Sequence, residues 1–212
     1  MIYRFSALFA LLLTTAAHAD PVANQVLDEI NFARTQPQQY AGIVAARAAN
    51  FRGAEGTRST GEAIAFLKKA RALPPLAWSQ GISQAALSHA LDVGSRGANG
   101  HKSLNGDLPW KRMARFGQWE GHAGENIDYG NRTARAIVVS LIVDNGVPSR
   151  MHRTNLFSRN YRFTGIAIAP HARTGTMCVM DFATRFFEAG EERLAARGPV
   201  ALRSEYSGTS FF

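Results

Sequence analysis

Two histidines of this chain lie in settings that could carry chemistry. His101 follows the run Gly-Ala-Asn-Gly at 97–100, and His152 lies in a segment that begins with Pro148. Glycines beside a histidine let the backbone approach closely and place the imidazole at a surface cleft rather than in the core. We therefore expect His101 and His152 to line a cleft.

Two carboxylates lie between these histidines in the sequence. Glu125 stands in the run Gly-Glu-Asn-Ile, and Asp144 ends an apolar stretch that we expect to be helical. A carboxylate at the end of an apolar helix is held at the rim of the core, where burial and neighbours perturb its pKa. Two imidazoles separated by carboxylates suit a divalent cation of the zinc type, with the carboxylates orienting the imidazoles or a bound water. A hydrogen-bonded polar cleft without a metal is the alternative, and the residues leave both open.

The other candidate groups have simpler interpretations. His89 falls on the expected buried stripe of a helix and is interpreted as a core histidine with satisfied hydrogen bonds. His122 and His171 are expected in loops, with no carboxylate beside them in the sequence. The single cysteine, Cys178, lies among apolar residues, which indicates a buried structural thiol and excludes an internal disulfide.

Apolar spacing predicts the elements that must position these residues. Ser79 and Thr133 are expected to cap long helices, and Asp107 a short one. Helices are expected over residues 22–33, 38–50, 62–73, 80 to between 92 and 95, 108–116 and 134–144. Strands are expected over 126–129, 161–169 and 176–182, with loops over 51–61 and 117–124 and a loop or short helical turn over 148–158. The last two strands form a hairpin, and this order predicts an α+β domain with helices on a mostly antiparallel sheet.

The first nineteen residues have the pattern of a cleavable signal peptide. Arg4 gives the positive start, residues 5–15 are almost wholly apolar, and Ala17-His18-Ala19 has the small-x-small form of a cleavage site before Asp20. The apolar run is well short of the ~20 residues that cross a bilayer, and we expect no later transmembrane span. We therefore expect a secreted or periplasmic protein, with a signal peptide at 1–19, one domain at 20–186 and a C-terminal tail at 187–212.

The net charge of +8 becomes +7 once Arg4 is removed. Most basic residues are scattered arginines, and the small cluster at 68–71 is typical of a solvated helix face, so we expect no nucleic-acid partner. For an exported protein, the positive charge favours attraction to an anionic surface of the cell envelope.

Three short elements resemble the CAP superfamily, which joins cysteine-rich secretory proteins, antigen 5 and plant pathogenesis-related proteins and has bacterial SCP-like members. The elements are Gly100-His101, the Gly-Glu-Asn-Ile run at 124–127 and the His-Arg-x-Asn-Leu run at 152–156, followed by a Gly-Ile-Ala-Ile strand. The resemblance extends from about residue 22 to residue 186. It implies a three-layer α-β-α sandwich with a broad cleft that holds a tetrad of two histidines and two acids.

The resemblance assigns the tetrad residue by residue. His101 and Glu125 look like the first histidine and the first acid, and His152 matches the second histidine. Asp144 lies where the second acid falls; family members usually have glutamate there, which is one methylene longer. Some relatives bind a metal through the two histidines alone, so the resemblance implies His101 and His152 as ligands of a weakly held Zn²⁺. The disulfides and the appended cysteine-rich module of the animal relatives are not expected here.

Two functions remain open at this point. The resemblance favours a non-enzymatic extracellular module that binds a lipid, a sterol, a peptide or another envelope component. The alternative is a secreted hydrolase, peptidase-like, that uses the tetrad around a metal-bound water or as acid and base. The sequence has no His-Glu-x-x-His helix and no Gly-x-Ser-x-Gly elbow, and Ser103 and Ser149 are expected to be ordinary loop serines. These absences favour the binding module.

Overall fold

The computed structural model of the chain describes residues 21–47 and 55–190. The expected signal peptide lies outside these residues, as does most of the expected tail. The described helices are α1 (Pro21–Thr35), α2 (Pro37–Arg47), α3 (Arg58–Lys69), α4 (Gln80–Gly94), α5 (Pro109–Met113), α6 (Ala134–Val143) and α7 (Met151–Leu156). The described strands are β1 (Ala77–Trp78), β2 (Gly117–Tyr129), β3 (Phe163–His171) and β4 (Gly175–Glu188).

These strands form one sheet in the order β1-β3-β4-β2. β4 pairs antiparallel with both β3 and β2, and the short β1 pairs parallel with β3. The expectation of a mostly antiparallel sheet and a β3–β4 hairpin is therefore confirmed. In this order β2 is an edge strand, and helices α5, α6 and α7 contact it.

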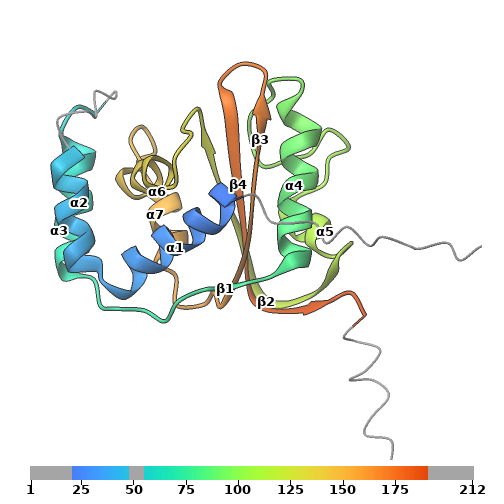
Figure 1. Cartoon of the computed structure of the whole chain (residues 1–212), viewed down its shortest axis with the longest axis horizontal. Helices are drawn as coiled ribbons and strands as arrows, with labels where there is room; N and C mark the ends of the chain where they lie inside the picture. Colours follow the sequence, from blue (N-terminus) through green and yellow to red (C-terminus); the bar gives the residue numbers. More distant parts are fainter. Residues whose placement is uncertain (1–20, 48–54, 191–212) are drawn as a thin grey trace, which may run out of the picture.

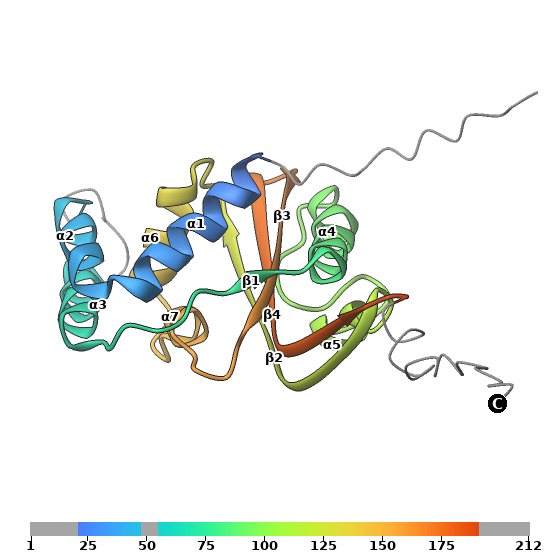
Figure 2. The same cartoon turned by 60° about the horizontal axis from the view of Figure 1, so that its bottom comes forward.

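The sheet lies between two layers of helices (Figures 1 and 2). Side chains alternate along β4, because successive residues of a strand point to opposite faces. Met180 and Phe182 join the large apolar cluster with α1, α2, α3, α6 and α7, whereas Met177 and Val179 join the cluster against α4. The fold is thus the expected three-layer α-β-α sandwich.

Local sequence accounts for the helices that flank the site. Ser79 Oγ accepts a hydrogen bond from the backbone N–H of Ile82 at 3.2 Å, and Thr133 Oγ accepts one from Ala136 at 3.3 Å. Both contacts satisfy N–H groups that a helix start leaves without an intrahelical partner. The predicted caps of α4 and α6 are confirmed.

Three details of the prediction are wrong. Residues 117–124, expected as a loop, are the first half of β2, because β4 continues far enough to pair Gly117 with Glu188. Asp107 caps no helix: α5 has Leu108 at its N-cap with no side-chain hydrogen bond. Helix α3 begins at Arg58, inside the segment expected as a loop, and ends at Lys69.

β4 continues two residues into the segment expected as the tail. The carboxylate of Glu188 accepts hydrogen bonds from Ser79 Oγ at 2.7 Å and from Gly81 N at 2.8 Å, and thereby joins the strand end to the start of α4. The domain boundaries stay a prediction. Within the described part of the chain, no helix combines the length and the apolar composition needed to cross a membrane.

Candidate functional site

The first predicted pair, His101 and Glu125, is in direct contact. Gly100 has a φ of +107°, which favours glycine and turns the chain so that His101 meets strand β2. The Nδ1 atom of His101 lies 2.7 Å from Oε1 of Glu125. The carboxylate can only accept, so Nδ1 is the donor and carries the proton. The histidine side chain is 50% exposed and the glutamate side chain 1%, so the ring lies at the surface on a buried support.

A buried arginine supports this pair from α5. Arg112 is fully buried, and its Nη2 donates to Oε2 of Glu125. Its Nη1 donates to the carbonyls of His101 at 2.9 Å and Asp107 at 3.1 Å. Burial lowers the pKa of His101, and the Arg112 charge lowers it further. Sequence reasoning missed Arg112, because one arginine among many carries no local pattern.

A second buried acid faces the same pair from β4. Asp181 is the cross-strand partner of Glu125, and its side chain is fully buried. Burial raises the pKa of both carboxyls, and the charge of Glu125 raises that of Asp181 further. Sequence reasoning missed Asp181, because its neighbours in β4 are mostly apolar and predict only a buried strand.

The second predicted pair, Asp144 and His152, is also in direct contact. Asp144 ends α6 with a φ of 56° in the left-handed region. Its Oδ1 lies 2.6 Å from His152 Nδ1, and its Oδ2 accepts the backbone N–H of His152 at 2.9 Å and of Arg153 at 3.3 Å. The aspartate therefore reaches His152 in spite of its shorter side chain, and it also caps the start of α7.

Strand β2 joins the two pairs. Asn155 of α7 donates to the carbonyl of Glu125 at 3.3 Å and to Oδ1 of Asn126 at 2.9 Å. Asn126 in turn donates to the carbonyl of His152 at 2.9 Å. Because Glu125 and Asn126 are consecutive, their side chains leave the strand on opposite faces. The two histidine–acid pairs thus lie on either side of the same edge strand.

The two imidazoles have the same hydrogen-bond arrangement. In each, a carboxylate holds Nδ1, and Nε2 has no partner among the described residues. A carboxylate on one ring nitrogen fixes the tautomer and leaves the other nitrogen as a lone-pair donor. Within residues 21–47 and 55–190, no group of three or more His, Cys, Asp or Glu side chains is arranged to hold a metal ion. The atoms available to bind a metal among the described residues are therefore the Nε2 atoms of the two imidazoles.

A cavity of about 210 Å³ lies beside the second pair. It is lined by Ile127, Asp128, Tyr129, Ser140, Leu141, Asp144, Asn145, Val147 and His152. Asp128, which sequence reasoning missed, is 4% exposed, and both of its oxygens accept hydrogen bonds from Asn131, at 3.0 and 2.9 Å. Burial raises the pKa of Asp128 to about 6. His101 and Glu125 do not line this cavity.

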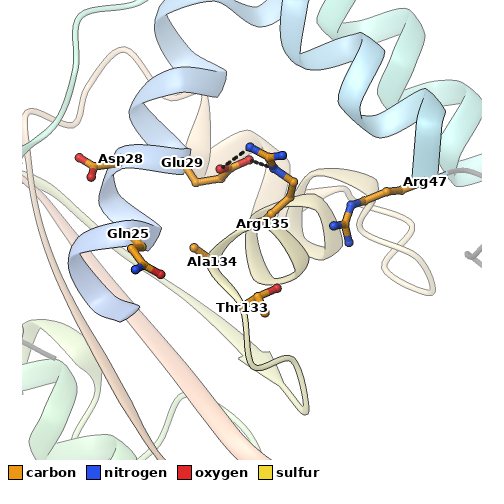
Figure 3. A pocket seen from close by; sticks show the side chains of 7 residues that line it. All are labelled: Gln25, Asp28, Glu29, Arg47, Thr133, Ala134 and Arg135. Carbon is orange, nitrogen blue, oxygen red and sulfur yellow. Dashed lines mark hydrogen bonds and ion pairs between the residues drawn. The ribbon is translucent and has the colours of Figure 1, made fainter. Parts of the chain in front are cut away.

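A larger open hollow of about 500 Å³ lies elsewhere, between α1, α2 and α6 (Figure 3). Across it Arg135 donates to Glu29 through Nε at 2.9 Å and Nη2 at 3.3 Å, with Arg47 on the facing side. The lining is charged and polar except for Ala134, and no tetrad residue contributes to it.

The predictions for His89 and Cys178 are confirmed. His89 is a core histidine, with its two ring nitrogens 3.1 Å from Ser103 Oγ and 2.9 Å from the Gly100 carbonyl. Ser103 Oγ thus lies within hydrogen-bond distance of His89, and Arg112 Nη1 donates to it at 3.4 Å. Cys178 is buried, as expected.

Two histidines expected in loops lie in strands. His171 ends β3 and is 2% exposed, with Nε2 3.1 Å from the Ala98 carbonyl. His122 lies in β2 with its side chain exposed. Both assignments to loops are wrong, because the strands are longer than their apolar segments.

A family profile matches most of the chain. Residues 27–182, more than half of the 212, match the family profile described as the cysteine-rich secretory protein family, CAP. An extracellular protein containing an SCP domain from Bacillus anthracis is similar with a TM-score of 0.43 and 23% identity, over 53% of this chain and 35% of that one. An outer surface protein from Borrelia burgdorferi is similar with a TM-score of 0.46 and 19% identity, over 53% of this chain and 80% of that one. The chain thus spans about a third of the length of the Bacillus protein that it matches. No curated protein matches the chain.

Proposed function

This chain belongs to the cysteine-rich secretory protein family, CAP, and on that premise we propose that it is an exported, non-enzymatic binding module. In this proposal the module holds a divalent cation of the zinc type through Nε2 of His101 and Nε2 of His152. Glu125 and Asp144 orient the two rings and do not ligate the cation. Export is supported by the signal-peptide pattern of residues 1–19.

One observation carries the metal proposal. Each imidazole has Nδ1 held by a buried carboxylate, at 2.7 Å and 2.6 Å, with Nε2 left over. Metal-binding histidines in proteins have this arrangement, because the carboxylate fixes the tautomer and the orientation of the ring. Two protein ligands make an open and weak site, so occupancy depends on metal supply and on pH.

Calorimetric titration with Zn²⁺ at neutral pH tests the proposal. The wild type is expected to give a saturable heat that is absent from the double variant His101→Ala, His152→Ala. The matched control is His122→Ala, which removes an exposed histidine of β2 outside both pairs. Its heats should equal those of the wild type. Identical heats in wild type and double variant would remove the metal site.

The cavity beside His152 supports a polar occupant. Its lining combines polar and apolar side chains; the polar ones are Asp128, Ser140, Asp144, Asn145 and His152, and the others are Ile127, Tyr129, Leu141 and Val147. The polar groups suit a peptide, with its N–H and C=O groups, better than the chain of a lipid or sterol. We propose that this cavity binds a peptide, with a lipid, a sterol or an anionic envelope surface as the alternative partners.

One observation favours hydrolysis as a second candidate function. A histidine whose Nδ1 is held by a carboxylate is also the arrangement of a general base. A screen with peptide and ester libraries, run on the wild type and on the double variant, separates the two functions. Turnover by the wild type that is absent from the double variant would show that the protein is a hydrolase and would overturn the proposal of a non-enzymatic binding module.

A further inference from the structure

Asp181 is a buried acid that the proposed function does not use. It lies near the middle of β4, opposite Glu125 of β2 in the antiparallel ladder, and its exposure is 0%. Directly opposed residues of neighbouring strands project from the same face of the sheet. The carboxyls of Asp181 and Glu125 therefore face each other in the layer between the sheet and α4 and α5.

The surroundings of Asp181 provide no donor for an ionised carboxylate. Neither of its oxygens accepts a hydrogen bond from an N–H or O–H group of the described residues. On the β3 side, the residue opposite is Gly165, which brings no side chain. Folded proteins rarely leave a buried charge without hydrogen bonds, because desolvation of that charge is not offset.

The charged and titratable groups near Asp181 come from three elements. Glu125 faces it from β2, Arg112 acts from α5, and His101 acts from the loop after α4. Arg112 donates to Glu125 through Nη2, and its buried Nε donates to no group of the described residues. On α4, His89 has both ring nitrogens engaged, by Ser103 and Gly100.

These contacts identify the ionised member of the carboxyl pair. Glu125 accepts from the guanidinium of Arg112 and from Nδ1 of His101, which stabilise its negative charge. Asp181 accepts from neither. Two carboxyls that face each other attract only when one of them carries a proton and donates it to the other.

We propose that Asp181 is protonated in the folded protein and donates its proton to Glu125, which makes it a positioning residue for the Glu125–His101 pair. Asp181 fixes the position of the Glu125 carboxylate, and the Glu125 carboxylate fixes Nδ1 of His101. The raised pKa of Asp181, caused by burial and by the Glu125 charge, is consistent with this arrangement. The proposal goes beyond the metal site and holds with or without a bound cation, so its tests use metal-free protein.

The pH dependence of stability in the variant Asp181→Asn tests the proton. An amide is neutral and can donate to Glu125, as the protonated carboxyl does. In the wild type, the unfolded chain loses the Asp181 proton above about pH 4 while the folded chain keeps it. Stability from this group is therefore present at low pH and falls as the pH rises.

Urea unfolding of both proteins from pH 4 to pH 7 measures the effect. The unfolding constant of the wild type divided by that of the variant is expected to rise by up to about tenfold per pH unit. All groups that titrate alike in both proteins cancel in this ratio. A ratio that stays flat or falls with pH would mean an ionised Asp181 and would overturn the proposal.

The tautomer of His101 tests the positioning role. In ¹⁵N-histidine-labelled protein, Asp181→Asn is expected to keep the Nδ1-protonated signature of His101, which His101→Ala identifies by its loss. Asp181→Leu keeps the branched shape of the side chain, although it is larger, and has no donor, so it is expected to give mixed tautomers. A wild-type spectrum in the leucine variant would overturn the positioning role. If that variant does not fold, a loss of the signature in Asp181→Asn would overturn it equally.

Discussion

At the residue scale, each imidazole of the site has one ring nitrogen engaged and one left over. The engaged atom is Nδ1 in both His101 and His152, and the acceptor is a carboxylate buried to 99% of its side chain. The same ring type behaves differently at His89, where both nitrogens are engaged inside the core. The site histidines therefore differ from the core histidine in that their Nε2 atom has no hydrogen-bond partner among the described residues.

His89 gives a prediction at this scale. Burial lowers its pKa to about 4, and the charge of Arg112 adds to the effect. The unfolded chain binds a proton below about pH 6.5 that the folded chain excludes, so stability from neutral His89 is present above that pH and lost as the pH falls toward 4. We expect a loss of about 1–3 kcal/mol between pH 6.5 and pH 4, after allowance for solvent screening.

Urea unfolding of the wild type and of His89→Gln at pH 6.5 and pH 4 measures this loss. The variant should lack this part of the pH dependence, whatever its stability at neutral pH. Equal losses in the two proteins would contradict a neutral buried His89.

At the element scale, the turn between α6 and α7 is held by side chains. Asp144 and Arg150 both have left-handed backbones, with φ of 56° and 50°, which non-glycine residues rarely adopt. The carboxylate of Asp144 accepts from two N–H groups of α7, and Arg150 pairs with Glu55 and Glu62 at 2.8 Å. These contacts offset the backbone strain and fix the start of the helix that carries His152.

The packing of α4 on β3 gives a prediction at this scale. A Cβ atom on Gly165 would clash with the backbone of Ser83, so α4 lies on the sheet at a distance that only glycine allows. We expect Gly165→Ala to destabilise the protein by about 1–3 kcal/mol or more, because the helix must move.

The matched control is Gly42→Ala in α2, where a Cβ meets no atom within 4 Å. Alanine in a helix interior is favoured over glycine, so this variant should gain about 0.5–1 kcal/mol. Thermal unfolding of both variants measures the two shifts. Shifts of the same sign would show that α4 does not pack as described.

Across the whole molecule, the described residues form three apolar cores on one sheet, one on the first face and two on the other. The larger core lies toward α1 and α6, the smaller cores toward α4, and β4 contributes side chains to all of them. Because β4 is common to the cores on both faces of the sheet, loss of the packing on one face removes the support of the other face. A single cooperative unfolding transition follows.

Leu67→Ala tests this cooperativity. Leu67 is fully buried in the larger core, on the layer remote from α4, and its truncation should cost about 2–5 kcal/mol. Far-ultraviolet circular dichroism and tryptophan fluorescence should report the same lowered midpoint. Leu91→Ala, on the outer face of α4 and 56% exposed, is the control and should change stability by less than about 0.5 kcal/mol. Two separate transitions in the Leu67 variant would contradict a single cooperative domain.

Features that depend on neighbours along the chain could be predicted from the sequence. Helices α1, α4 and α6 follow from apolar residues at helical spacing, and two of them from the caps Ser79 and Thr133. These signals are local, because a helix closes its hydrogen bonds within four residues. His101, Glu125 and His152 were found because each stands in a short run that resembles a known family.

Features that depend on partners far away in the sequence could not be predicted and became visible in the folded structure. The first half of β2 is a strand because β4 pairs with it, from Gly117 with Glu188 to Ala123 with Ala183, and its own glycine-rich and polar residues give no apolar alternation. Asp128, Arg112 and Asp181 belong to the site because folding buries them against its histidines and acids. Burial and charge pairing are properties of the folded surroundings, so no spacing rule could have selected these three residues.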